Sequence, residues 1–302
     1  MRELHSTNIV ARLQKRLQRF IKRLRHEHPK IGLALGGGGA RGLAHIGVLK
    51  ALDAANIPID VITGASIGGA IAAAYAMGKS PVEIETVAMR YANPMQLMRL
   101  MDPSPFQRGF LQGKRVRAVL ESIIGAQSTF ANTRIPLALT AVDLPRGQLV
   151  ILRDGSLLDA VMATSAVPGL WPPVPHGDAQ LVDGGILNNL PVDVARQMGA
   201  DVIIAVSVAP RFPRPDPIIL DVPFLPHFGD QFYQSVLILS DALTRHQLEE
   251  AHPEIVLTPE MDDSIWLLGF DQASQAIRAG ELAVQQRLEE IRKVISNEGY
   301  IP

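Results

Sequence analysis

The sequence predicts an α/β fold of three layers, with a mostly parallel central sheet between helices. Short apolar runs rich in β-branched residues alternate with helix-like segments from Ile31 onward, as in parallel strands joined by right-handed crossovers. The run at residues 201–208 is apolar almost throughout, which is typical of a strand buried on both faces. With 302 residues, 47% hydrophobic and 20% charged, the chain is apolar enough for a sizeable core.

The composition excludes several classes of function. The chain has no cysteine, which excludes disulfides, thiolate metal sites and cysteine nucleophiles and is compatible with a reducing compartment. The formal net charge of -1 gives no whole-molecule reason to expect nucleic-acid binding. No run of 18 apolar residues is present, so we expect no transmembrane helix.

Residues 1–30 predict a basic amphipathic helix, because apolar residues recur there at steps of three and four. The segment contains only two acids, Glu3 and Glu27, but nine basic residues: Arg2, Arg12, Lys15, Arg16, Arg19, Lys22, Arg23, Arg25 and Lys30. Two interpretations stay open: the apolar stripe packs on the protein body, or residues 1–28 lie on an anionic membrane. The segment lacks the apolar core of a secretory signal. We therefore expect a cytoplasmic protein, held peripherally on the inner face of a membrane in the second interpretation.

Residues 31–302 are expected to form one domain, whose first half alternates strands and helices. The predicted elements are strands at 31–35 and 60–63, a glycine-rich loop at 36–42, and helices at 43–55, 70–77, 81–91 and 114–124. Between the last two helices, residues 94–113 look irregular, apolar and partly exposed. The order strand, helix, strand, helix implies a right-handed parallel unit.

The second half continues this alternation. It predicts strands at 135–142, 148–152, 179–182, 201–208 and 254–257, a helix capped by Asp154 or Ser156 and ending near 164, and helices at 192–198, 232–246 and 270–296. Residues 210–231 carry six prolines, which argues against regular structure, yet they are too apolar for a plain linker. The segments 94–113 and 210–231 either line a pocket or form a lid over it, or they serve as core cover or an oligomer contact.

A short stretch around Ser66 predicts a nucleophile elbow. The apolar strand ending at Thr63 leads into Gly64-Ala65-Ser66-Ile67-Gly68, and a helix follows. This is the GxSxG spacing, in which a sharp turn between strand and helix presents a serine at its tip. Side chains larger than glycine would clash with the adjoining strand and helix.

The glycine-rich loop at 36–42 has two readings. Its backbone N–H groups converge before a helix, which would stabilise the oxyanion formed when a serine attacks an acyl group. Gly37, Gly39 and Gly42 also fit the dinucleotide fingerprint GxGxxG. That fingerprint requires an acid at the end of the second strand, whereas Asp60 stands at its start. A purely structural glycine turn is a third reading.

A nucleophilic serine also needs a base, and the sequence offers two kinds. The candidate histidines are His45, His176, His227, His246 and His252, of which none has a marked local context. Asp183 ends a predicted strand and precedes Gly184-Gly185, which allow another backbone to approach. A partly buried carboxylate there could serve as the general base of a dyad, although a turn aspartate that stabilises its own loop is the commoner case.

Three motifs in this order resemble the patatin-like phospholipase family. They are Gly37-Gly38-Gly39-Ala40-Arg41-Gly42, Gly64-Ala65-Ser66-Ile67-Gly68 and Asp183-Gly184-Gly185. The resemblance covers about residues 31–210. Within this range it includes the small-residue stretch Ala163-Thr164-Ser165-Ala166-Val167-Pro168 before the aspartate. The glycine-rich run is most similar to the branch that contains neuropathy target esterase and its small bacterial relatives.

The resemblance implies a lipid acyl hydrolase with a Ser–Asp dyad and without a metal or organic cofactor. It implies Ser66 as nucleophile, Asp183 as general base, the N–H groups of Gly37, Gly38 and Gly39 as oxyanion donors, and Arg41 as support of that loop. The implied substrates are phospholipids, lysophospholipids or neutral acylglycerols. Two rivals stay open: a non-lipid esterase or thioesterase with His176 in a triad, and a catalytically silent membrane-binding protein of the same fold.

Overall fold

The computed structural model describes residues 28–103, 109, 111–210, 227–262, 265 and 269–297, and for residues 227–233 and 297 it describes the backbone alone. The helix predicted at residues 1–30 lies outside the described residues except for 28–30, which form neither helix nor strand. Most of the proline-rich segment 210–231 also lies outside them.

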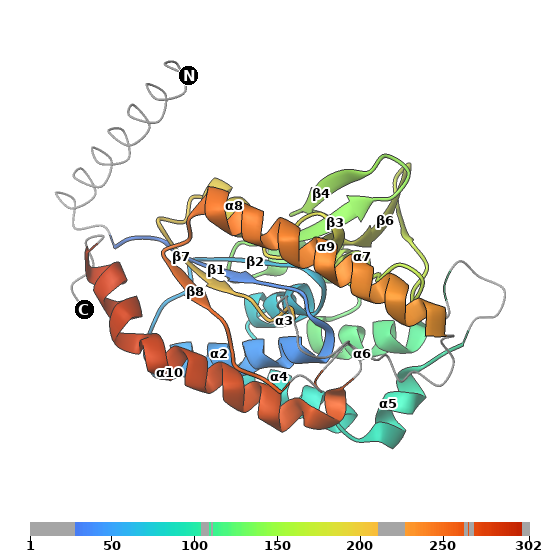
Figure 1. Ribbon diagram of the computed structural model, residues 1–302, viewed down its shortest axis with the longest axis horizontal. Helices are drawn as coiled ribbons and strands as arrows, with labels where there is room; N and C mark the ends of the chain where they lie inside the picture. The colour runs from blue at the N-terminus through green and yellow to red at the C-terminus, as the bar shows by residue number, and fades with distance from the viewer. Residues whose placement is uncertain are drawn as a thin grey trace, which may run out of the picture.

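Within the described residues, eight strands form one sheet in the order β5-β6-β3-β2-β1-β7-β8, and β4 pairs with β3 (Figure 1). They are β1 (Ile31–Leu35), β2 (Val61–Gly64), β3 (Leu137–Asp143), β4 (Gln148–Leu152), β5 (Val174–His176), β6 (Ala179–Asp183), β7 (Val202–Val206) and β8 (Ile255–Leu257). The neighbouring strands β3, β2, β1, β7 and β8 pair in parallel. The antiparallel pairs are β3 with β4, β3 with β6, and β5 with β6. The predicted α/β fold with a mostly parallel central sheet is therefore confirmed.

The register of β3 brings the ends of β2 and β6 together. Leu139 pairs with Gly64 on one edge of β3 and with Leu152 of β4 on the other. Two residues further along, Ala141 pairs with Asp183, while β4 continues along the opposite edge. Strands β2 and β6 thus share one edge of β3, run in opposite directions and end facing each other.

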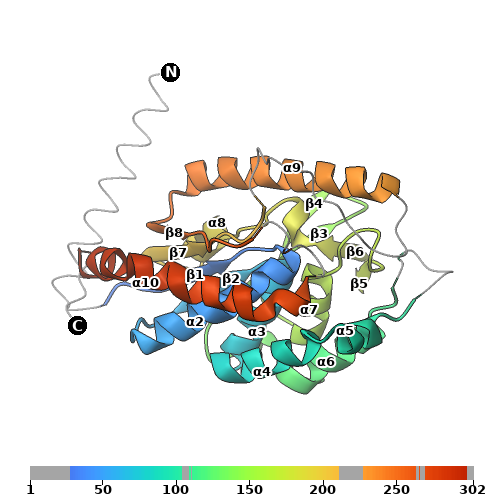
Figure 2. The same ribbon diagram turned by 60° about the horizontal axis from the view of Figure 1, so that its bottom comes forward.

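Helices cover both faces of the sheet (Figure 2). The α-helices are α2 (Ala44–Ala54), α3 (Ser66–Ala76), α4 (Pro81–Tyr91), α5 (Pro94–Leu100), α6 (Lys114–Ile124), α7 (Leu157–Thr164), α8 (Val192–Gln197), α9 (His227–Ala251) and α10 (Ala273–Asn297), and the 3-10 helices are η1 (Gly39–Leu43), η2 (Phe130–Asn132), η3 (Gly184–Ile186) and η4 (Phe270–Gln272). Helices α8 and α9 lie over one face, and α2, α3, α4 and α10 lie over the other (Figures 1 and 2).

The core divides in the same way, because side chains alternate along each strand. Leu33 and Ile204 belong to the larger apolar cluster with α2, α3 and α10, whereas Ala34 and Ile203 belong to the smaller cluster beneath α8 and α9. The contact between α2 and α10 is close enough that a methyl group on Gly47 would overlap the carbonyl of Ile277.

The structure corrects several predicted boundaries. Residues 94–100, predicted to be irregular, form helix α5, because the Asn93 side chain caps its first turn and Pro94 occupies a position that proline tolerates. Helix α9 begins at His227, before the predicted 232, and α3 begins at Ser66 itself. Ser156, not Asp154, caps α7. Among the described helices, none combines the length and apolarity needed to cross a bilayer.

Candidate active site

Ser66 stands at the first residue of α3 in a strained backbone conformation. Its φ of 54° lies in the left-handed region, which costs a non-glycine residue about 1–3 kcal/mol. The flanking glycines are required by space: a Cβ on Gly64 would lie 2.7 Å from the backbone of Gly69, and one on Gly68 would overlap the carbonyl of Leu35. The predicted sharp turn between strand and helix is therefore present, with the serine at its tip.

The hydroxyl of Ser66 donates a hydrogen bond of 2.6 Å to Oδ2 of Asp183. The other carboxylate oxygen, Oδ1, accepts the N–H of Gly185 at 2.7 Å. Asp183 is only 6% exposed, and burial raises its pKa to about 6, against the opposing effect of these two hydrogen bonds. The site thus joins a serine hydroxyl directly to a carboxylate that is more basic than an exposed aspartate.

The last residue of α7 and the loop that follows it hold both halves of this pair. Thr164 Oγ1 accepts the N–H of Ser66 at 3.0 Å, and the carbonyl of Ala166 accepts the N–H of Asp183 at 2.9 Å. Thr164 is fully buried. Sequence reasoning did not assign this hydroxyl a role, because no local pattern links Thr164 to a serine 98 positions away.

The glycine-rich loop lies beside Ser66, but its N–H groups are not equivalent. The N–H of Gly37 donates to the carbonyl of Asn189 at 3.1 Å, and Asn189 Nδ2 donates back to the carbonyl of Gly37 at 3.2 Å. Gly37, predicted to be an oxyanion donor, thus has its N–H engaged. No hydrogen bond in the described part of the chain occupies the N–H of Gly38 or Gly39. Asn189 is a second residue that sequence reasoning missed.

Arg41 anchors this loop to distant segments. Its Nε donates to the carbonyl of Val208 at 2.9 Å, and its Nη1 donates to the carbonyls of Asp262 at 3.1 Å and Ile265 at 3.2 Å. The side chain is only 7% exposed. These contacts agree with the predicted supporting role and not with direct contact to an oxyanion.

The candidate histidines with described side chains do not join the serine, and the side chain of His227 lies outside the described part of the structure. His45 is fully buried behind the glycine-rich loop, where Nε2 lies 2.7 Å from the carbonyl of Gly36 and burial lowers its pKa to about 4. His45 is therefore neutral and donates to Gly36. His176 is exposed on the edge strand β5. Among the histidines whose side chains the structure describes, none hydrogen-bonds to Ser66 or Asp183.

Asp60, the acid that a dinucleotide site would need, has a structural role instead. Its Oδ2 accepts the N–H of Ile31 at 2.7 Å, where β1 begins. The carboxylate therefore lies at the opposite end of the parallel strands from the glycine-rich loop. The geometry does not assemble the dinucleotide fingerprint.

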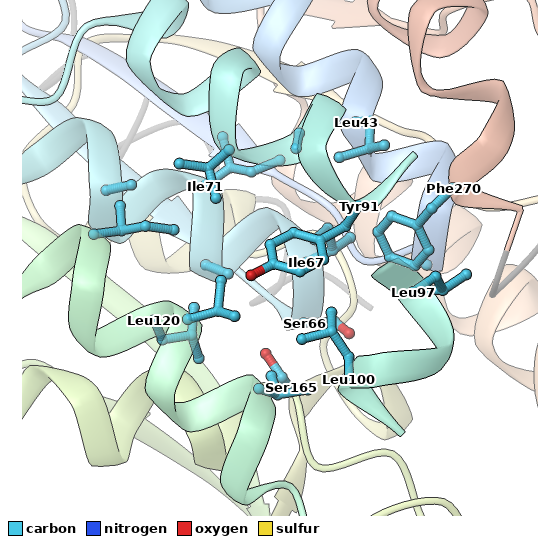
Figure 3. Close-up of a pocket in the computed structure, with 18 of the residues that line it drawn as sticks. Leu43, Ser66, Ile67, Ile71, Tyr91, Leu97, Leu100, Leu120, Ser165 and Phe270 are labelled. Atoms are coloured by element: carbon cyan, nitrogen blue, oxygen red, sulfur yellow. The ribbon is translucent and has the colours of Figure 1, made fainter. Parts of the chain in front are cut away.

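Ser66 opens onto an apolar cavity of about 230 Å³. Helix α3 forms one wall with Ile67, Ala70, Ile71 and Ala74, and α4, α5 and α6 supply most of the rest. Figure 3 shows Tyr91, Leu97, Leu100 and Leu120 pointing into the same space as Ser66. The arrangement places a serine–carboxylate pair beside a space suited to an aliphatic chain.

Comparisons with known proteins agree with the sequence motifs. Residues 33–196 match the family model described as patatin-like phospholipase. Patatin-like phospholipase domain-containing protein 6 of Homo sapiens is 36% identical over 182 residues, which cover 59% of this chain and 13% of that protein. An uncharacterized NTE family protein of Mycobacterium tuberculosis is 35% identical over 182 residues, which cover 60% of this chain and 49% of that protein. The alignments thus span about half or less of these relatives.

A solved structure shares the fold. The crystal structure of VipD from Legionella pneumophila aligns with a TM-score of 0.52 at 14% identity, over 87% of this chain and 67% of that one. At this identity the likeness concerns the fold alone. Since the family model spans more than half of the 302 residues and all three motifs meet at one site, the chain belongs to the patatin-like phospholipase family.

Proposed function

We propose that this chain is a serine acyl hydrolase that releases a fatty acid from a lipid ester. The observation that carries the proposal is the 2.6 Å hydrogen bond from Ser66 Oγ to Asp183, made at the wall of an apolar cavity. Family membership supports hydrolysis of lipids in general. The candidate substrates are phospholipids, lysophospholipids and neutral acylglycerols.

In the first half of the reaction, Ser66 Oγ attacks the acyl carbonyl while its proton passes to Asp183 Oδ2. The carbonyl oxygen becomes an oxyanion, for which Gly38 and Gly39 are the available N–H donors of the loop. The intermediate then collapses: the bond to the leaving alkoxide breaks, Asp183 returns the proton to that oxygen, and an acyl-enzyme remains on Ser66.

In the second half, Asp183 takes a proton from water, and the resulting hydroxide attacks the acyl-enzyme. The second tetrahedral intermediate expels Ser66 Oγ, which recovers its proton from Asp183, and the fatty acid leaves. A pKa of about 6 suits both steps, because the carboxylate is ionised at neutral pH and yet a stronger base than an exposed aspartate.

The cavity supports an acyl chain as the bound group. Its α3 wall runs from Ser66 to Ala74, a rise of about 12 Å at 1.5 Å per residue. The lining side chains are almost all aliphatic or aromatic. Each buried methylene contributes about 0.8 kcal/mol, so a long chain gains affinity there that a short ester does not.

The geometry gives no support to a triad through His176. That histidine is exposed on β5, and both oxygens of Asp183 are already occupied, one by Ser66 and one by the N–H of Gly185. A triad would instead require an imidazole between the serine and the carboxylate.

A substrate panel tests the proposal. Wild type, Ser66→Ala and Asp183→Asn are assayed on a phospholipid, a lysophospholipid, a triacylglycerol, an acyl thioester and a short water-soluble ester. We expect wild type to prefer a long-chain oxygen ester and both variants to lose at least 10²-fold in kcat, as for removal of a general base. Preference for the thioester or the short ester would favour the non-lipid rival. Equal hydrolysis by wild type and Ser66→Ala would overturn the proposal.

A further inference from the structure

Helix α5 is apolar on both of its long sides. Met95 and Met98 face outward and are 66% and 68% exposed, whereas Leu97 and Leu100 line the same cavity as Ser66 (Figure 3). Helical spacing explains this division, since Met95 and Met98 lie three residues apart on one side and Leu97 and Leu100 on the other. No residue of this helix is buried. Two neighbouring, exposed methionines next to a cavity are a candidate interaction surface.

The surroundings of α5 are cationic. Between residues 86 and 120 the sequence contains one acid, Asp102, which is buried and accepts the N–H groups of Gly113 and Arg115. Arg90 and Lys114, on the neighbouring helices, and Arg99, on α5, are exposed. Among the described residues, no carboxylate forms an ion pair with Arg90, Arg99 or Lys114.

Helix α5 is held at its ends and not by the sheet. Asn93 caps its first turn, and Arg115 Nη1 donates to the carbonyls of Arg99 at 2.9 Å and Met101 at 3.1 Å. Its main packing partners are α4, α6 and η4, which surround the cavity. The outer face of α5 therefore lies directly over the space into which an acyl chain would pass.

We propose that the outer face of α5 docks on an anionic phospholipid bilayer. Met95 and Met98 enter the acyl region, and Arg90, Arg99 and Lys114 contact the headgroup phosphates. This inference rests on the proposed function, because docking here lets a lipid chain pass from the bilayer into the cavity beside α5. A second copy of the chain is disfavoured as the occupant, since a two-fold contact through α5 would bring Arg99 and its basic neighbours together.

Vesicle binding tests the docking surface separately from catalysis. The full chain carrying Ser66→Ala is titrated with vesicles of phosphatidylcholine and phosphatidylglycerol in equal amounts, with and without the pair Met95→Gln and Met98→Gln. We expect the pair to weaken binding at least about tenfold, which corresponds to about 1.4 kcal/mol of lost apolar insertion. The pair Met95→Leu and Met98→Leu should bind like the parent.

The matched control lies on the opposite face of the sheet. Ile238 and Leu239 on α9 are 46% and 70% exposed, so the pair Ile238→Gln and Leu239→Gln removes comparable apolar surface. We expect this control to bind vesicles like the parent. Unchanged binding of the Met95/Met98 glutamine pair, or an equal loss in the α9 control, would overturn the docking surface. If the Met95/Met98 glutamine pair abolished a dimer seen in sedimentation but left vesicle binding intact, the occupant of this face would be a second copy of the chain. This result would also overturn the membrane-docking surface.

A short water-soluble ester separates failure of the docking surface from failure of the proposed function. With Ser66 intact, the Met95/Met98 glutamine pair should hydrolyse this ester at the wild-type rate and the vesicle lipid at least about tenfold more slowly. If the Met95/Met98 glutamine pair and wild type hydrolysed the vesicle lipid at equal rates, the docking surface would be overturned and the proposed function would stand. Absence of serine-dependent hydrolysis of any ester would overturn the proposed function, and the docking surface would then rest on its binding result.

Discussion

Ser66 Oγ and Asp183 Oδ2 are 2.6 Å apart, although their residues are 117 positions apart in the chain. The sheet accounts for this contact. Strand β2, which leads into Ser66, and β6, which ends at Asp183, share one edge of β3 and converge at Leu139 and Ala141. The antiparallel course of β6 is therefore what brings a carboxylate to the elbow.

The pH dependence of catalysis should follow Asp183. In the proposed reaction the carboxylate accepts the Ser66 proton only when it is ionised, and burial raises its pKa to about 6. We therefore expect kcat/KM on a soluble ester to fall as pH drops through about 6, whereas an ordinary aspartate would keep its activity down to about pH 4. A rate that stays constant between about pH 7 and pH 4.5 would contradict the assignment of Asp183 as base.

Asp183 should also make the fold less stable at neutral pH. The folded chain releases this proton near pH 6 and the unfolded chain near the ordinary value of 3.8, so the folded state binds more protons between these values. The free energy of unfolding then falls as pH rises through this window, by about 3 kcal/mol in all. Asparagine does not ionise, so Asp183→Asn removes this pH-dependent loss of stability.

Urea unfolding of wild type and Asp183→Asn at about pH 4 and pH 8 measures the effect. The stability of the variant relative to wild type should increase by about 2 kcal/mol between these two pH values, because the unfolded carboxyl is already partly ionised at pH 4. If the difference between the two proteins does not change with pH, Asp183 is not the buried titrating group described here.

Thr164→Val should impair the chemical step while leaving substrate binding intact. Valine keeps the shape of threonine but cannot accept the N–H of Ser66, and an unsatisfied buried donor costs about 1–3 kcal/mol. Since Ser66 is already strained at φ 54°, we expect its backbone to relax and kcat to fall about tenfold or more, with KM little changed.

Thr164→Ser is the matched control, because it keeps the hydroxyl. It should retain a kcat near that of wild type. Similar kcat values for the valine and serine variants would show that Thr164 contributes packing alone, and thermal unfolding of both variants would separate any general loss of stability.

Ala74→Leu should shorten the apolar cavity at the end distant from Ser66. Ala74 lies on the cavity wall eight residues along α3, about 12 Å from Ser66 by helical rise. We expect kcat/KM to fall for long-chain esters and to stay unchanged for short ones. Ala70→Leu, one turn from Ser66, should affect shorter chains too. An equal loss on all chain lengths in Ala74→Leu would indicate that the acyl chain lies elsewhere.

The basic N-terminal segment should give membrane binding a dependence on salt. Replacing Arg12, Arg16, Arg19 and Arg23 with glutamine removes four positive charges and leaves the apolar stripe in place. Binding to anionic vesicles should weaken at low salt and vary less with ionic strength than that of wild type. If the salt dependence stays the same, residues 1–28 do not contact the membrane electrostatically.

Sequence reasoning predicted the serine elbow, the aspartate that ends β6 and every described strand except β5, because each of these has a local signal. The three-residue strand β5 (Val174–His176) was missed, since it lies in a proline-rich stretch that reads as a loop. The β-branched run before Gly64 and the Asp183-Gly184-Gly185 turn could be read directly from neighbouring residues. The choice between a histidine and Asp183 as base was not local, and only the family resemblance separated them. Their positions relative to Ser66 depend on the register of β3.

The supporting contacts could not be predicted for the same reason. Thr164 meets Ser66 across 98 residues, and Asn189 meets Gly37 across 152, so no spacing rule reaches either pair. Helix α5 is a different case. Its signals were present in Asn93 and Pro94, but the prolines and scattered apolar residues that follow masked a helix of seven residues.

Labelling with a tagged fluorophosphonate, followed by peptide mass spectrometry, identifies the reactive residue. If Ser66 and Asp183 form a dyad, the label bonds to Oγ of Ser66, Asp183→Asn slows labelling at least about 10²-fold, and Ser66→Ala abolishes it. Labelling of another residue, or a rate at Ser66 that does not depend on Asp183, would contradict the Ser66–Asp183 dyad.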